Sequence, residues 1–199
     1  MRSEDAAPGT LLAVRHGAVP GRLTLVLRGE EGSVSYPVAE RFYTALGAPA
    51  AGYVFSEAEM EHLLAHVAQR RALASALGSL ARGDESRRNL YLKLRRKGHS
   101  DTAARAALDE VERLGYLKET DSAERLVVRC ADKGWSRRKT HAYLLRRGYG
   151  SAAVTHAIDA AIAAGEADFE ENKRLFREKQ LALGLSPDAV RRALWRAGF

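Results

Sequence analysis

The stretch "LYLKLRRKGHS" (Leu90–Ser100) decides the fold, because this chain of 199 residues repeats its pattern twice more at a fixed spacing. The same pattern recurs as "THAYLLRRGYG" at residues 140–150 and as "VRRALWRAGF" at residues 190–199. A constant period of 50 residues without insertions is typical of stacked units of supersecondary structure. The positions that recur at this period are Ser86, Ser136 and Ser186; Leu94, Leu144 and Leu194; and Gly98, Gly148 and Gly198.

The sequence pattern of each unit predicts three short helices. In the first helix, Ser86 caps free backbone amides, Leu90 and Leu94 form one apolar face, and Gly98 ends the helix in a left-handed turn. A second helix begins at Ser100 or Asp101 and stops at Gly115, and a longer one covers residues 121–134, with a counterpart at 171–184. No unit can bury its own faces alone, so we expect the units to stack into an elongated, curved, mainly α-helical solenoid.

The N-terminal part has a different pattern. Residues 11–38 contain short apolar or alternating runs separated by glycine-rich turns, which predict a small β-hairpin or three-stranded sheet. A serine followed by an acidic turn predicts a helix over residues 57–81, which could break near Gly78. We therefore expect a β-rich extension over residues 1–55 and three helical repeats over 56–199, at about 56–117, 118–167 and 168–199, with the last one shortened.

The net charge of +7 is unevenly distributed along the chain. Residues 1–85 carry 8 Lys and Arg against 10 Asp and Glu, whereas residues 86–199 carry 24 against 15. The basic part is the part that contains the repeats. Such an asymmetry favours an anionic partner, of which nucleic acid is the commonest, although a well-solvated helical surface also needs charge.

Motifs for catalysis are lacking. There is no phosphate-binding glycine-lysine loop, and no serine or cysteine stands in a motif that would activate it as a nucleophile. His62 and His66 have metal-ligand spacing, but the glutamate of a zinc protease is replaced by Leu63, so ordinary surface histidines are the simpler interpretation. The single cysteine, Cys130, fits a buried position. We expect no enzyme activity, no metal and no cofactor.

Aromatic residues are interleaved with the basic ones in the repeats. This arrangement is also found in proteins that stack the bases of single strands. Trp135 and Leu185 occupy the same repeat position, and the aliphatic replacement favours packing between units over base stacking. No apolar run is long enough for a membrane span and no secretion signal is evident, which predicts a soluble cytoplasmic protein, most simply a monomer.

Over about residues 70–199 the chain resembles the RecX family of bacterial recombination regulators. The resemblance rests on the leucine, basic pair, glycine and aromatic or histidine pattern, followed by a short helix, "LGYL", a longer helix and a second "RRKTHAYLLRRGYG". It implies three tandem three-helix repeats that bind the RecA filament on single-stranded DNA and inhibit its recombinase, ATPase and coprotease activities. The chain departs from the family at "YLKETDSAERL", where Glu119 and Ser122 replace an expected Asp and Phe.

If the resemblance holds, basic residues repeated at one period would contact RecA or DNA. A solvated helix charge is the simpler interpretation of any one of them, so the hypothesis concerns the set as a whole. An alternative is a direct DNA- or RNA-binding protein that acts without a recombinase, and a third is an interaction module whose charge serves only solubility. The candidates are Arg87, Arg88, Lys93, Arg95, Arg96, Lys97, Arg137, Arg138, Lys139, Arg146, Arg147, Arg191, Arg192 and Arg196.

Overall fold

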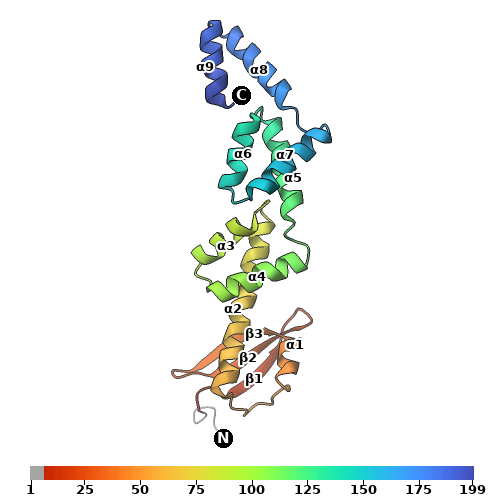
Figure 1. The fold of residues 1–199 in the computed structure, drawn as a ribbon. Coiled ribbons are helices and arrows are strands. Elements are labelled where there is room, and N and C mark those ends of the chain that lie inside the picture. The colour runs from red at the N-terminus through yellow and green to blue at the C-terminus, as the bar shows by residue number, and fades with distance from the viewer. Residues whose placement is uncertain (1–6) are drawn as a thin grey trace. The chain divides into compact units, whose positions relative to one another are not determined.

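The computed structural model describes residues 7–199 and divides them into two compact units. One unit contains residues 7–74 together with 99–107, and the other contains residues 75–98 together with 108–199. Each unit has its own buried apolar cluster. The expected combination of a small N-terminal sheet with a mainly helical chain is confirmed (Figure 1).

The N-terminal unit is built on an antiparallel sheet of β1 (Leu11–His16), β2 (Arg22–Arg28) and β3 (Ser33–Ala39), with β2 in the centre. Alternation places Leu23, Leu25 and Leu27 of β2 in the buried cluster. Helix α1 (Glu40–Ala45) contributes Phe42 to that cluster, and α2 (Glu57–Leu80) contributes Leu63 and Val67. The hairpin is therefore stabilised by packing on helices, and α2 continues through Gly78 without the break that the sequence suggested.

His66 is not an ordinary surface histidine, contrary to the simpler interpretation of the sequence. Its ring is partly buried and stacks on Phe42, with 3.9 Å between the ring centroids, and its Nε2 accepts a long hydrogen bond of 3.5 Å from the amide of Ala39. Burial, followed by the nearby charges of Arg70 and Arg41, lowers the pKa of His66 to about 4.

We expect the N-terminal unit to lose stability as the pH falls from about 6.5 to 4. The folded state holds His66 neutral, so the stabilisation is complete above the unfolded pKa and is lost as the imidazole becomes protonated, at a cost of about 2 kcal/mol. An NMR titration gives the pKa of His66. Urea unfolding, monitored at the amides of the sheet between these pH values, measures the loss of stability. His66→Gln should remove the pH dependence, and a titration midpoint near 6.5 would contradict the assignment.

The remaining helices keep the 50-residue offset at their boundaries. Helices α3, α6 and α9 begin at residues 87, 137 and 187, α4 and α7 begin at 101 and 151, and α5 and α8 begin at 119 and 169. The longer helix therefore starts two residues before the position expected from the sequence. The observed bounds are α3 (Arg87–Arg96), α4 (Asp101–Arg113), α5 (Glu119–Asp132), α6 (Arg137–Arg146), α7 (Ser151–Ala163), α8 (Phe169–Ala182) and α9 (Pro187–Ala197).

Helices α5, α6 and α7 share one buried apolar cluster. Leu126 and Val127 of α5, Leu144 of α6 and Ile158 of α7 belong to one buried cluster, which also contains Cys130. Burial raises the pKa of the Cys130 thiol, as expected for a small core residue. This core fixes α6, which carries basic residues on its exposed surface.

Candidate nucleic-acid interface

A basic cleft lies where α6 of one repeat meets α8 and α9 of the next. Its volume is about 450 Å³, and its lining contains four cationic side chains and no Asp or Glu side chain. Three aromatic side chains line the same cleft. We call it the α6–α9 cleft, and its charged and aromatic lining residues are Arg138, Lys139, Arg146, Arg196, Trp135, Phe176 and Phe199.

The local sequence explains how the cations reach this cleft. Ser136 caps α6 by accepting from the amide of Lys139 at 3.2 Å, which fixes the first turn of the helix. Arg146 lies two helical turns after Lys139, so both side chains lie on the same helix face. Arg196 comes from the last turn of α9, where the negative end of the helix dipole favours a cation.

Aromatic rings lie against some of these cations. Lys139 Nζ lies 4.2 Å from the centre of the Trp135 ring, and the guanidinium of Arg138 lies 5.7 Å from that of Trp195. Arg138 also donates to the carbonyl of Trp195 at 2.6 Å. Trp195 is 69% exposed, whereas Trp135 is partly buried and contacts Tyr143 edge-on, in line with the packing role expected from its repeat position.

The chemistry of this cleft suits a polyanion with flat rings. Cations without acidic side chains beside them attract phosphates, and the partly exposed rings of Phe176 and Phe199 offer a stacking surface to bases. Four of the fourteen basic candidates from the sequence meet here: Arg138, Lys139, Arg146 and Arg196.

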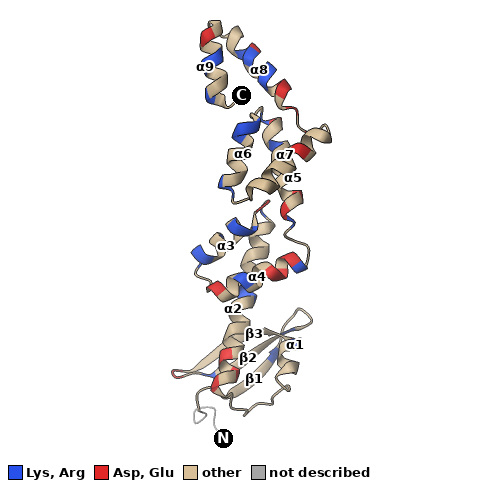
Figure 2. Ribbon diagram, in the orientation of Figure 1, with Lys and Arg blue, Asp and Glu red and all other residues tan. Residues whose placement is uncertain are grey.

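Basic positions recur on α3, α6 and α9 (Figure 2). Several of the other candidates are engaged within the protein. Arg87 pairs with Asp109 and Glu112, which raise its pKa, and Arg137 pairs with Asp159 at 2.6 Å. Lys93 pairs with Glu85, and Arg191 with Asp188. The exposed candidates outside the cleft are Arg88, Arg95, Arg96, Lys97 and Arg192.

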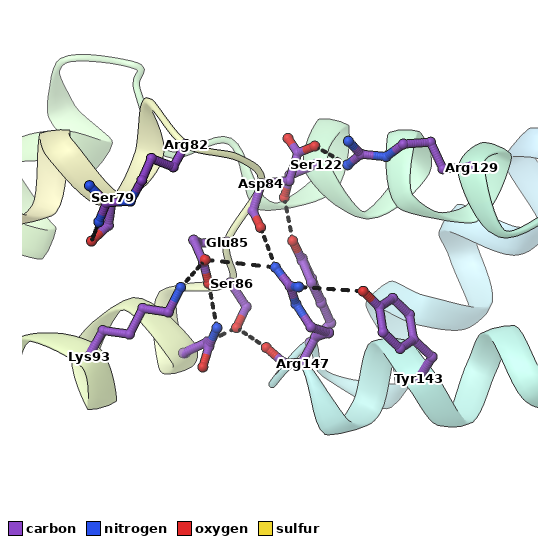
Figure 3. A network of polar contacts seen from close by, with 12 residues as sticks. Ser79, Arg82, Asp84, Glu85, Ser86, Lys93, Ser122, Arg129, Tyr143 and Arg147 are labelled. Atoms are coloured by element: carbon purple, nitrogen blue, oxygen red, sulfur yellow. Dashed lines mark hydrogen bonds and ion pairs between the residues drawn. The ribbon is translucent and has the colours of Figure 1, made fainter. Parts of the chain in front are cut away.

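Arg147 belongs to a polar network that joins α3, α5 and α6 (Figure 3). Its Nη2 donates to the carbonyl of Asp84 at 2.6 Å and lies 3.7 Å from the carboxylate of Glu85, which is only 5% exposed. Asp84 in turn accepts from Arg125 and Arg129. Partial burial raises the pKa of Asp84, but these two arginines outweigh it and hold that pKa below its ordinary value.

The recurrent serines have a second role that the sequence did not reveal. Ser86 Oγ donates to the carbonyl of Arg147 at 2.6 Å, and Ser136 Oγ donates to the carbonyl of Ala197 at 2.8 Å. Each serine therefore caps its own helix and also binds the end of the equivalent helix in the next repeat. We call these two contacts the serine joints. The signal was present in the sequence as Ser86 and Gly148, but only the packing of two repeats shows that Ser86 Oγ lies within 2.8 Å of where a Cβ on residue 148 would be.

A second, mixed pocket of about 370 Å³ lies beside the network and includes Lys93, Arg129, Arg147, Asp84 and Glu85. Its acidic residues already pair with those cations. Within residues 7–199, no group of three or more His, Cys, Asp or Glu side chains is arranged to hold a metal ion. In the same part of the chain, no helix is both long enough and apolar enough to cross a membrane.

Comparison with known proteins points to one family. A regulatory protein RecX of Stenotrophomonas maltophilia is 35% identical over 123 residues, which cover 62% of this chain and 65% of the relative. A regulatory protein RecX of Halorhodospira halophila is 30% identical over 130 residues, which cover 63% of this chain and 78% of the relative. The chain belongs to the RecX family. No protein-family model matches it.

A solved structure supports the RecX fold. A crystal structure of a regulatory protein RecX superposes with a TM-score of 0.74 over 96% of this chain and 94% of the other, at 14% sequence identity. The match to the Stenotrophomonas relatives spans less than two thirds of their length. The comparisons therefore establish the family and the fold. The α6–α9 cleft is the candidate site whose residues can be tested by substitution.

Proposed function

We propose that this chain regulates RecA by binding the RecA filament on single-stranded DNA and inhibiting its recombinase, ATPase and coprotease activities. Membership of a family of regulatory proteins supports a regulatory role. The observation that carries the proposal is the α6–α9 cleft, which presents four cations and three aromatic rings with no Asp or Glu side chain. Within a filament, such a cleft can hold a segment of phosphate backbone with its bases.

Regulation in this proposal depends on occupancy and not on chemistry. A bound helical body competes with duplex DNA and with coprotease substrates for the filament, and it needs no cofactor. The basic residues outside the cleft, such as Arg88 and Lys97, remain free for contact with phosphates or with acidic side chains of the recombinase. The protein acts in the cytoplasm, as a monomer, in DNA repair and the SOS response.

The ATPase rate of the cognate RecA on single-stranded DNA tests this proposal. We expect substoichiometric amounts of the protein to inhibit the rate, and inhibition to weaken between 50 and about 200 mM salt because phosphate contacts release counterions. Lys139→Ala/Arg146→Ala should reduce the inhibition, whereas Lys179→Ala, a change outside the cleft, should not. Unchanged ATPase activity at a stoichiometric excess of folded protein contradicts the proposal.

Direct binding of nucleic acid without a recombinase is the second candidate function. The aromatic rings of the cleft favour it, because base stacking does not require a protein partner. The two candidates differ in one measurement. A regulator of the filament binds the RecA–DNA complex more tightly than the same DNA alone, whereas a direct binder shows no gain when RecA is added.

A further inference from the structure

A groove in the N-terminal unit shares no lining residue with the α6–α9 cleft. It has a volume of about 420 Å³ and lies between the loop that joins β1 to β2, the paired ends of β2 and β3, and one face of α2. Its lining contains three arginines, Arg22, Arg70 and Arg71, and no Asp, Glu or aromatic side chain. We call it the sheet–α2 groove.

The face of α2 that covers the sheet supplies two of these arginines (Figure 1). Leu63 and Val67 are buried in the cluster that α2 shares with the sheet. Arg70, Arg71 and Ala74 follow Val67 at spacings of three, four and seven residues, so they lie on the same helix face. Arg71 and Ala74 are exposed, and Arg70 is partly buried. This face is therefore apolar against the sheet and cationic in the groove.

The loop between β1 and β2 holds the third arginine and an apolar side chain in place. The amide of Gly17 donates to the carbonyl of Arg22 at 3.0 Å, and the amide of Arg22 donates to the carbonyl of Val19 at 3.3 Å. Val19 lines the groove and is 53% exposed, although it is apolar. Leu23 and Val38 also line the groove and belong to the buried cluster. The groove therefore combines exposed cations with the edge of an apolar core.

The three arginines have no carboxylate partner within the described part of the chain. The ion pairs found in residues 7–199 all join other side chains. An arginine presents parallel N–H donors whose spacing matches the two oxygens of a carboxylate. An anionic ligand can therefore bind in the groove without displacing an internal ion pair.

We propose that the sheet–α2 groove binds an acidic peptide segment of a partner protein. Carboxylates of that segment face Arg22, Arg70 and Arg71, and its aliphatic side chains contact Val19 and the edge of the core at Leu23. This inference is independent of the function proposed for the α6–α9 cleft, and its test needs neither RecA nor single-stranded DNA.

The apolar lining selects a peptide over nucleic acid. Arginines attract carboxylates and phosphates alike, so charge alone does not distinguish the two ligands. Bases stack on aromatic rings, and no aromatic side chain lines the sheet–α2 groove. Its apolar lining, which includes Val19, Pro37 and Val67, is aliphatic and suits the aliphatic side chains of a peptide.

A fluorescein-labelled peptide of alternating glutamate and leucine residues provides the probe, and the same peptide with glutamine in place of glutamate is its control. Fluorescence anisotropy with the full chain should show about tenfold tighter binding of the glutamate peptide, which corresponds to about three partly exposed ion pairs. The difference should shrink at high salt, because counterions screen charges that solvent reaches.

Charge reversal provides the matched comparison. R22E/R71E should abolish the preference for the glutamate peptide and should favour a peptide with lysine in place of glutamate. R15E/R41E makes the same change in charge in the same unit, also with one arginine from a strand and one from a helix, but neither residue lines the groove. It should keep the original preference. Circular dichroism confirms that each variant is folded.

The apolar contact has a test of its own. V19S should weaken binding of the glutamate–leucine peptide about threefold, because the exposed valine side chain no longer offers apolar contact area. A peptide with serine in place of leucine should bind V19S and the unchanged protein equally. Equal binding of the leucine peptide to both proteins would contradict the apolar contact.

Several results would overturn the proposal. These are equal binding of the glutamate and glutamine peptides, a preference that survives R22E/R71E or is lost equally in R15E/R41E, or the absence of binding at millimolar peptide. Competition of the glutamate peptide by oligothymidylate, lost in R22E/R71E, would assign the groove to nucleic acid instead. Self-association of the protein in sedimentation, lost in the same variant, would assign it to a second copy.

Discussion

Replacing Lys139, Arg146 and Arg196 with alanine should weaken binding of single-stranded oligothymidylate about a hundredfold at 50 mM salt. The three side chains line a cleft with no Asp or Glu side chain, so each can neutralise a phosphate without a competing side-chain ion pair. Removing three phosphate contacts should also reduce the slope of log affinity against log salt by about 2, because single strands release about 0.7 counterions per contact. Fluorescence anisotropy over a range of salt concentrations measures both quantities.

A matched triple variant distinguishes the effect of the cleft residues on binding from the effect of the net charge. Arg15→Ala/Arg41→Ala/Lys179→Ala removes the same charge from positions outside the cleft lining. It should leave the salt slope almost unchanged and weaken binding less than tenfold, through the general field alone. Equal losses in the two variants would mean that binding depends on overall charge, and the cleft would no longer be the site.

The repeat pattern predicts the helices well because it reflects interactions between residues of the same helix. Capping serines, leucines four residues apart and glycines at left-handed positions act within one helix, so residues 86–98 alone define α3. The same offset then places α6 and α9. The alternating residues of β2 likewise predict its buried face, since only neighbouring strands and covering helices are needed to explain it.

The division of the basic residues between binding and structure could not be predicted in this way. Arg146 and Arg147 are neighbours in the sequence, yet one lines the cleft and the other is held by Asp84 and Glu85. The acceptors of Arg147 lie more than 60 residues away in another repeat. A single sequence shows the charge of each side chain but not which carboxylate or carbonyl of another repeat lies beside it.

Gly148→Ala should destabilise the protein by about 2–3 kcal/mol, whereas Gly98→Ala, at the equivalent position, should cost only about 1 kcal/mol. Both glycines have a positive φ, +88° and +83°, so the backbone strain is the same in the two variants. The methyl group at residue 148 would lie 2.8 Å from Ser86 Oγ, while at residue 98 it meets no atom within 4 Å. Urea unfolding followed by far-UV circular dichroism measures the difference, which is the cost of placing a methyl group against the serine joint.

The Ser86 hydroxyl cannot move away from such a methyl group without loss, because it donates to the carbonyl of Arg147 and accepts from the amide of Asn89. In a Ser86→Ala background the closest contact is removed and Arg88 Cβ at 3.3 Å and Asn89 N at 3.4 Å remain beside the methyl group, so the added cost of Gly148→Ala should fall towards the value of about 1 kcal/mol at Gly98. Equal costs for the two glycines in the wild-type background would contradict a rigid contact between Ser86 and residue 148. A difference that disappears with Ser86 would show instead that one periodic serine–glycine pair both ends the helices and couples one repeat to the next.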